Sequence, residues 1–517
     1  MIRRTMARVP PFRLRAGGYA ALLSLFSLVS ASDIDAAVGK RKFDFVVGVD
    51  GDWKAAIAAA AKQASPTYRY RIFFPNGEYN VGALTGDSNQ KTTFTTANVS
   101  FIGQSAEKTI LFNKSANEGI GITATLFLSN ADNMYMQDLT VMNRANYGQS
   151  STYGETGRHV AIQEQSSKMI YKNVKQLSTQ DTYYTNGQRT YWEGGQIDGT
   201  TDFICGGGDI FFNRVILNEL KDGSPITASS PNDNSWGYVF ESCIINATKS
   251  GYQLGRSWGE ARVVFLRTTM NQLASDAGWG NPMNNVPKVS AEFRTADANG
   301  KPVDLSKRRT TYTKDAVTIK LNPVLTDAEA AKYTVENVLG GSDNWKPDDL
   351  TRQVSAPAAG VEGTTLKWND NDSALCWVIF KGGKFLDNVT TGSYDISKLS
   401  QGDVLTVRAA NSMGGLGASS NAITVGQSVG TAFFFPLHPI PAMERIGRLL
   451  RVSPLPGEAA LRIFAVDGSL NRNIRIPPMD AARTIDLETQ GLAAGVYFAS
   501  IEGTGIRSAT IRISVPK

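Results

Sequence analysis

The chain has 517 residues, of which 42% are apolar and 19% are charged, and its formal net charge is +6. This composition excludes a disordered chain, and the length predicts two to four domains with a sizeable core. Only three cysteines and two histidines are present, which excludes a disulfide scaffold and argues against a structural zinc site or a histidine-centred mechanism.

Residues 1–37 have the pattern of a secretory signal peptide. Five arginines precede an apolar run at 19–31, and small residues near 31 or 37 provide a cleavage site. The run is shorter than the ~20 residues that span a membrane, and no other stretch approaches that length. We therefore expect a secreted or cell-surface protein without a membrane span.

Residues 41–350 alternate short β-rich runs with Gly, Asn or Asp. One helix is predicted at Trp53–Gln63, with Asp52 as its N-cap. The long helices of a doubly wound sheet are absent, and a run recurs every twenty to thirty residues. These features predict an all-β fold, a parallel β-helix with a long side face suited to a polymeric ligand. The clearest runs are 98–103, 126–130, 136–143, 169–174, 210–215 and 238–245.

Three clusters on this predicted solenoid carry chemistry, at 180–184, 198–206 and 254–258. Asp181 and Asp202 are 21 residues apart, close to one rung, and adjacent rungs lie about 4.8 Å apart. Two carboxylates that close favour one protonated acid and one anion. A single aspartate before a turn is more often a turn or capping residue. The pair at one-rung spacing, with an arginine and a tryptophan further on, favours a site.

At these clusters the chain resembles the pectin methylesterases. The segments QDTY at 180–183, GTTDFICG at 199–206 and LGRSW at 254–258 are similar to that family's QDTL, GTVDFIFG and LGRPW. Further matches extend the resemblance over about 300 residues, at 160–162, 226–228, 291–293 and 333–341. The resemblance implies a right-handed parallel β-helix. It also implies an esterase that releases methanol from methyl-esterified pectin (homogalacturonan).

The resemblance also implies residue roles. Asp202 matches the nucleophile, and Asp181 the acid that protonates methanol and then activates water. Gln180 matches a donor to the oxyanion, and Arg256 the arginine that keeps the nucleophile ionised. Three aromatic residues, Trp258, Phe203 and Tyr184, would line the groove. The resemblance implies no metal or organic cofactor.

One position departs from the family pattern. The family has a second glutamine just before its "AVAL" strand, where this chain has Arg158, followed by His159. An arginine can also donate to an oxyanion. Its charge could instead block the subsite or favour a galacturonate carboxylate, and a solvated arginine beside an altered loop is the simpler alternative. We predict no role for His159.

Other functions remain open at this point. The chain could hydrolyse another esterified uronate polymer by the same mechanism, or bind polysaccharide at a surface without catalysis. A glycosidase or lyase is less favoured, because lyases on this fold recruit Ca²⁺ through acidic clusters and none is found. The presence of both aspartates together with Arg256 favours catalysis.

The cysteines admit two interpretations. Cys205 and Cys243 fall on neighbouring parts of the solenoid, where either a disulfide or two small buried apolar residues would fit. Cys376 lies in a strand-like run of the following module and is predicted to be a core thiol.

Two small β-sandwich-like domains are predicted after the solenoid. Residues 352–428 are similar to a fibronectin type III or Ig-like module. In secreted enzymes such modules are usually spacers or weak carbohydrate binders, and the sequence does not discriminate between these uses. A Gly/Pro-rich linker follows at 429–444. Residues 445–517 resemble the sorting domain of type IX secretion cargo, so a secretion machinery is a candidate partner. An ordinary terminal β-sandwich is the alternative. We expect a monomer.

The charge is unevenly distributed along the chain. The five leader arginines and a net +4 over residues 445–517 leave residues 32–444 at −3. The high isoelectric point, near 9.0, therefore gives no reason to expect a nucleic-acid partner. An acidic polysaccharide would have to be bound by a few placed cations such as Arg256 and Arg158.

Overall fold

A computed structural model describes residues 39–426, apart from gaps at 85–91, 116–123, 149–156 and 232–234, and most of residues 443–515. The predicted signal peptide lies outside the described residues, as does nearly all of the predicted linker. Within the described part of the chain, no helix is long and apolar enough to cross a membrane.

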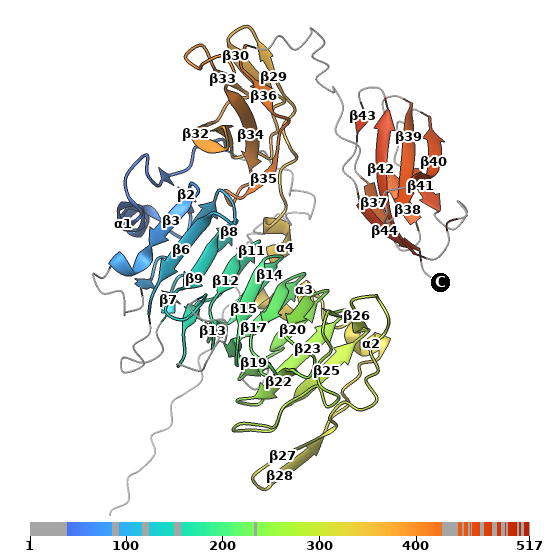
Figure 1. The fold of residues 1–517 in the computed structure, drawn as a ribbon. Coiled ribbons are helices and arrows are strands. Elements are labelled where there is room, and N and C mark those ends of the chain that lie inside the picture. Colours follow the sequence, from blue (N-terminus) through green and yellow to red (C-terminus); the bar gives the residue numbers. More distant parts are fainter. Residues whose placement is uncertain are drawn as a thin grey trace, which may run out of the picture. The chain divides into compact units, whose positions relative to one another are not determined.

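Three parallel sheets coil into a β-helix (Figure 1). A complete rung contributes one strand to each sheet, and the rungs at the two ends contribute fewer. The ten-stranded sheet has the order β1 (Phe45–Val46), β2 (Tyr70–Phe74), β5 (Val99–Gly103), β8 (Tyr135–Gln137), β11 (Met169–Lys172), β14 (Arg189–Glu193), β17 (Asp209–Asn213), β20 (Tyr238–Glu241), β23 (Arg262–Leu266), β25 (Val289–Phe293). The seven-stranded sheet has the order β22 (Gln253–Ser257), β19 (Pro225–Ser229), β16 (Ile204–Gly206), β13 (Tyr183–Thr185), β10 (Val160–Gln165), β7 (Ala124–Ser129), β4 (Thr92–Phe94). The nine-stranded sheet has the order β26 (Ala296–Asp297), β24 (Thr269–Met270), β21 (Ile244–Ala247), β18 (Ile216–Glu219), β15 (Gln196–Gly199), β12 (Lys175–Leu177), β9 (Thr140–Asn143), β6 (Thr109–Asn113), β3 (Gly77–Asn80).

The corner between the ten-stranded and nine-stranded sheets repeats from rung to rung. One residue there adopts a left-handed conformation, as in Asp138 (φ 54°), Arg214 (φ 57°) and Ser242 (φ 52°). Its N–H donates to a carbonyl of the next rung, at 3.2, 2.9 and 2.9 Å respectively. Several runs read as single strands in the sequence are therefore two strands joined by a corner: 136–143 divides at Asp138 and 238–245 at Ser242.

The interior of the coil is a continuous apolar column. Inward-facing residues of successive rungs meet in register, because parallel pairing places equivalent positions directly above one another. Trp192, Phe212, Phe240 and Phe265 pair in this way. The last three rings stack face to face, with centroids 4.4 Å apart at each step. This column holds the rungs at a fixed spacing beneath the outer faces.

Both ends of the column are closed. Helix α1 (Trp53–Gln63) begins at Asp52, whose side chain accepts the N–H of Ala55, and it packs Trp53 against the first rungs. At the other end Arg308 forms a buried ion pair with Glu292, at 2.6 Å from Nε to Oε1. The hairpin of β27 (Thr311–Lys314) and β28 (Val317–Lys320) follows, then α2 (Asp327–Ala330), α3 (Val335–Leu339) and α4 (Pro347–Leu350).

A small antiparallel module follows the helices. One sheet contains β29 (Ala359–Glu362), β30 (Thr365–Trp368) and β33 (Ser393–Asp395). The other contains β32 (Lys384–Val389), β31 (Cys376–Lys381), β34 (Val404–Ala410), β35 (Leu416–Ser419) and β36 (Ile423–Thr424). The two sheets share one apolar core. Its assignment to the fibronectin type III type remains a prediction.

This module is docked on the ten-stranded sheet rather than tethered to it. Phe73 and Tyr135 of the β-helix share an apolar cluster with Val378 and Phe380 of the module. Arg408 of β34 donates to Asp138 Oδ2 at 3.2 Å, and also to backbone carbonyls on both sides of the contact, at 2.7–3.0 Å. The module therefore belongs to the same packed body as the β-helix.

The last described segment forms a second antiparallel unit. β37 (Met443–Ile446), β38 (Leu449–Val452) and β41 (Arg483–Asp486) form one sheet. β39 (Ala459–Ala465), β40 (Leu470–Ile476), β42 (Gly495–Gly503), β43 (Ile506–Arg507) and β44 (Ile511–Val515) form the other. Residues of both sheets share a core. The predicted fold class, a parallel β-helix followed by small antiparallel β units, is confirmed; the predicted domain limits remain predictions.

The docking contact yields a stability prediction. Arg408→Ala removes donors from several carbonyls and leaves Asp138, 11% exposed at its side chain, without a guanidinium partner. We expect the free energy of unfolding to fall by about 2 kcal/mol, measured by urea denaturation. The control is Arg352→Ala, because Arg352 pairs with Asp349 from a side chain that is 67% exposed and should cost less than about 0.5 kcal/mol. Equal losses in the two variants would contradict the docked arrangement.

Candidate active site

Two aspartates occupy the same place in successive rungs, in the turns that enter the seven-stranded sheet. Asp181 precedes β13 and Asp202 precedes β16, and these strands pair with Tyr183 opposite Ile204. The N–H of Asp181 donates to the carbonyl of Thr201 at 3.2 Å. The aspartates are 8% and 4% exposed, and both have a left-handed φ, 57° and 51°. The predicted one-rung spacing therefore holds in the structure.

An arginine from two rungs further on binds one of these carboxylates. Arg256 on β22 donates from Nε to Asp202 Oδ1 at 2.9 Å and from Nη2 to Oδ2 at 2.5 Å. The Asp202 side chain is 6% exposed and the Arg256 side chain 32%. Such a bidentate contact stabilises the carboxylate as an anion and fixes its orientation.

The outward-facing positions of the seven-stranded sheet form a row beside the aspartates. Parallel pairing aligns Gln163, Tyr184, Cys205, Ala228 and Arg256 across five strands. We call this surface, with the two aspartates, the site face. It brings charged, polar and aromatic groups onto one outer wall of the coil.

Two of the three predicted aromatic residues lie on the site face. The rings of Tyr184 and Trp258 are 6.1 Å apart and tilted by 38°, and both side chains are partly exposed. Phe203 is different: it is 0% exposed and belongs to the apolar column. Phe203 is the last residue of the turn before β16, and it points inward together with the following residue, Ile204. Phe203 therefore supports the turn of Asp202 from behind instead of lining the surface as predicted.

Gln180 and Arg158 are neighbours through their backbones. A parallel bridge joins them, and the N–H of His159 donates to the carbonyl of Gln180 at 3.1 Å. Both residues are half-buried. His159 is 3% exposed, with Nδ1 lying 3.4 Å from the hydroxyl of Thr179. The departure from the family pattern therefore stands directly beside the predicted oxyanion donor.

Cys205 is a site-face residue that the sequence interpretation did not assign. All three cysteines are free and buried, which excludes the disulfide between Cys205 and Cys243. Burial first, and then the negative charges of Asp181 and Asp202, raise the pKa of the Cys205 thiol well above its ordinary value. Its place in the row opposite Tyr184 follows from strand alternation, the one sequence signal that would have revealed it.

A buried carboxyl group lies behind the site face. Glu164 is 0% exposed. It accepts hydrogen bonds from the hydroxyls of Tyr171 at 2.6 Å, Tyr183 at 3.0 Å and Thr190 at 2.5 Å. Burial raises the pKa of Glu164 to about 7, although these donors act in the opposite direction. The sequence interpretation did not single out Glu164.

No metal site accompanies these groups in the part of the chain that the structure describes, where no three His, Cys, Asp or Glu side chains are placed to hold an ion. The functional groups that the site face does present are carboxylates, amides, a guanidinium and a thiol.

The chain is thus a parallel β-helix protein with a candidate site on its outer wall. The site consists of a stacked aspartate pair, an arginine bound to one aspartate, and two aromatic rings alongside. The Pectinesterase family model matches residues 44–342. The chain belongs to the pectinesterase family.

Individual relatives are distant. The chain is 27% identical over 267 residues to a putative pectinesterase/pectinesterase inhibitor of Arabidopsis thaliana, a match that covers 48% of this chain and 26% of that protein. It is 26% identical over 230 residues to putative pectinesterase 11 of the same plant, covering 44% of this chain and 59% of that one. These matches thus span less than two thirds of each relative. A crystal structure of a pectin methylesterase mutant with a hexasaccharide is 25% identical, covers 59% of this chain and 99% of its own, and has a TM-score of 0.46.

The raised pKa of Glu164 predicts a pH-dependent stability. Because the folded state holds the proton more tightly than the unfolded state, the stabilisation is full below the ordinary pKa of 4.5 and is lost as pH rises through about 7. Glu164→Gln cannot ionise. We expect the free energy of unfolding of the wild type, relative to this variant, to fall by about 3 kcal/mol between about pH 4 and about pH 8.

Chemical denaturation of both proteins across this range measures that difference. Other titrating groups are common to the two proteins and cancel. Parallel stability curves would show that Glu164 keeps an ordinary pKa.

Proposed function

We propose that this protein hydrolyses the methyl esters of galacturonate units in pectin, giving methanol and de-esterified pectin. The observation that carries the proposal is the stacked pair of Asp181 and Asp202, with Arg256 bonded through two nitrogens to Asp202. Membership of the pectinesterase family supports the substrate class. A protein that only binds polysaccharide has no need of this charged triad.

In the first step, Asp202 acts as the nucleophile. A carboxylate oxygen of Asp202 attacks the ester carbonyl carbon and forms a tetrahedral intermediate. The carbon–methoxy bond then breaks, and the proton of Asp181 passes to the departing oxygen, so methanol leaves and an acyl-enzyme remains. The Arg256 contact favours this assignment of roles, with Asp202 as the nucleophile and Asp181 as the acid, because it keeps Asp202 ionised while Asp181 carries the proton.

In the second step, the acyl-enzyme is hydrolysed. Asp181, now a carboxylate, takes a proton from water as the hydroxide oxygen attacks the acyl carbon. The bond to Asp202 breaks, which restores Asp202 as an anion and leaves Asp181 protonated for the next cycle. The galacturonate group is released as a carboxylic acid, which then loses its proton to solvent. No external oxidant, reductant or cofactor enters the balance.

We infer that Gln180 and Arg158 donate hydrogen bonds to the oxyanion of both intermediates. Their backbones are bridged in adjacent rungs, and an amide and a guanidinium each donate N–H groups. Arg158 also brings a permanent charge that a glutamine lacks. We infer that this charge binds the free carboxylate of a neighbouring galacturonate, so that the enzyme prefers pectin that is already partly de-esterified.

The site of action follows from residues outside the solenoid. We infer from the arginine-led apolar start of the chain that the protein is secreted or held at the cell surface, where pectin is met. The C-terminal antiparallel unit is a candidate for recognition by a secretion machinery.

Methanol release tests the proposed reaction. The full chain should release methanol from methyl-esterified pectin, and Asp202→Asn should lower kcat by at least roughly 10³-fold, because the nucleophile is lost. Asp222→Asn is the matched control: Asp222 pairs with Lys249 on the surface, and this variant should retain full activity.

The other outcomes separate the alternatives. If methanol is released only from a different uronate ester, that ester replaces methyl-esterified pectin as the proposed substrate. Binding of pectin without any methanol release would replace the esterase with a binding protein. Full activity in Asp202→Asn would remove Asp202 as the nucleophile.

The role of Arg158 has its own test. Arg158→Gln restores the family residue and removes the charge. We expect KM for sparsely esterified pectin to rise roughly tenfold, the worth of one charge-assisted hydrogen bond, with little change for densely esterified pectin. Arg158→Lys keeps the charge and should lie between the two. An equal change on both substrates would assign Arg158 to the oxyanion alone.

A further inference from the structure

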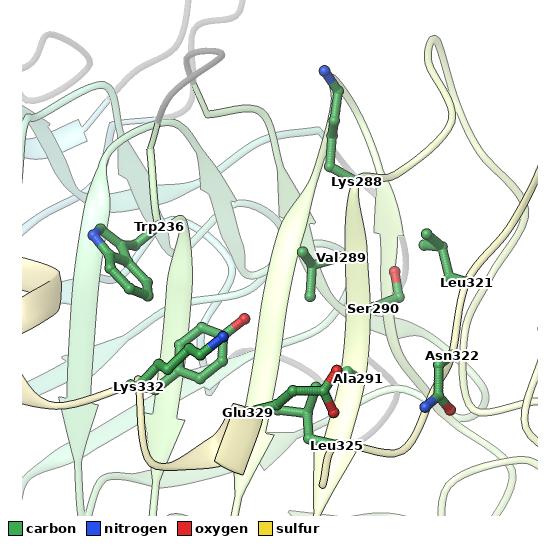
Figure 2. A pocket seen from close by; sticks show the side chains of 11 residues that line it. Trp236, Lys288, Val289, Ser290, Ala291, Leu321, Asn322, Leu325, Glu329 and Lys332 are labelled. Atoms are coloured by element: carbon green, nitrogen blue, oxygen red, sulfur yellow. The ribbon is translucent and has the colours of Figure 1, made fainter.

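A pocket with a volume of about 300 Å³ lies beside the last strands of the ten-stranded sheet, not on the seven-stranded sheet that carries the site face (Figure 2). Val289 and Leu325 form part of its apolar lining, and Trp236, Tyr333, Lys288 and Lys332 stand around it. A volume of this size is at the lower end for small-ligand sites and suits a single sugar ring.

The pocket is connected to the site face by neighbouring loops. Trp236 lies on the loop that follows β19, and Trp258 on the loop that follows β22. The N–H of Trp258 donates to Ser229, the last residue of β19, at 3.2 Å. Near the N-terminal ends of the strands of the ten-stranded sheet, Tyr238 pairs with Val263 and Val263 with Ser290. Trp236 and Lys288 each lie two residues before a member of this row, so they occupy equivalent positions two strands apart.

The lining suits a sugar that carries a carboxylate. The rings of Trp236 and Tyr333 meet edge to face with centroids 5.5 Å apart and supply an aromatic wall of the kind on which apolar sugar faces pack. Lys332 is exposed and makes no ion pair with any other residue that the structure describes. In Figure 2 its side chain reaches inward below Trp236, whereas that of Lys288 points outward from the rim.

The acidic groups nearby are already engaged. Glu329 accepts the N–H and the hydroxyl of Thr326, both at 2.8 Å, as part of the cap of α2. Glu260 pairs with Lys288 at 2.9 Å. Of the two lysines that line the pocket, Lys332 is therefore the one that forms no ion pair with a described residue, and the charge of Glu329 acts on it from nearby.

We propose that this pocket is an accessory binding site for a uronate unit of an acidic polysaccharide chain, with the sugar ring against Trp236 and its carboxylate on Lys332. The inference rests on the proposed function, because it assumes an acidic polymer as substrate. A polymer held here and at the site face is bound at two points, which strengthens its binding without a new contact at either one. A short oligomer that fills only the site face gains nothing from the pocket.

Kinetics on two substrates tests this role. For Lys332→Gln we expect KM on long esterified pectin to rise roughly tenfold, or about 1.4 kcal/mol, with kcat unchanged and with both constants unchanged on a short esterified oligomer. Lys108→Gln, at an exposed lysine of the N-terminal rungs, is the matched control and should leave KM unchanged. Equal KM for wild type and Lys332→Gln on the polymer would overturn the proposal.

Hydrogen–deuterium exchange locates the bound chain independently of turnover. Full-length Asp202→Asn is mixed with long de-esterified oligogalacturonate. We expect protection at 180–184 and 202–206, and also at 286–292 and 329–333, with only the latter pair lost when Lys332→Gln is added. Protection confined to the first pair overturns the accessory site and leaves the esterase standing. Protection nowhere also overturns it, and methanol release by the wild type then decides the proposed function separately.

Discussion

The parallel register between rungs is the constraint on which the rest of the structure depends. Each corner residue donates its N–H to the next rung, and the stacked rings of Phe212, Phe240 and Phe265 hold the same spacing inside. Because equivalent positions repeat at one-rung intervals, two aspartates in successive turns are brought to one wall without any special loop. Arg256 then reaches Asp202 from two strands further on in the same sheet.

Much of this could be predicted from the sequence, because the solenoid is a local repeat. The 21-residue interval between Asp181 and Asp202 equals the offset of paired strands β13 and β16, and the helix at 53–63 has the predicted bounds. The corners could not be predicted, because their left-handed residues include arginine and serine, which give no composition signal. The same limit misplaced Phe203: its direction depends on where the turn ends and the strand begins.

Contacts between distant segments were invisible at the sequence level. The module after residue 352 has its own core and so looked like a spacer, yet Arg408 ties it to Asp138, a corner residue of the β-helix. For Cys205 the sequence offered a disulfide or a packing role, and only the register shows that it lies near Asp181 and Asp202. In both cases the contact depends on which residues of distant segments lie opposite each other, and no local sequence pattern predicts that pairing.

The unequal lengths of the connections have an evolutionary consequence. The turn from β15 to β16, which carries Asp202, spans only residues 200–203, whereas the loop from β19 to β20 spans 230–237. An insertion in the tight turn would displace Asp202, the proposed nucleophile, but an insertion in the longer loop leaves the register of the strands unchanged. Under the proposed function, a lineage built on this coil can therefore change the length and pattern of the polymer it accepts by remodelling one edge, while the reacting groups stay constant.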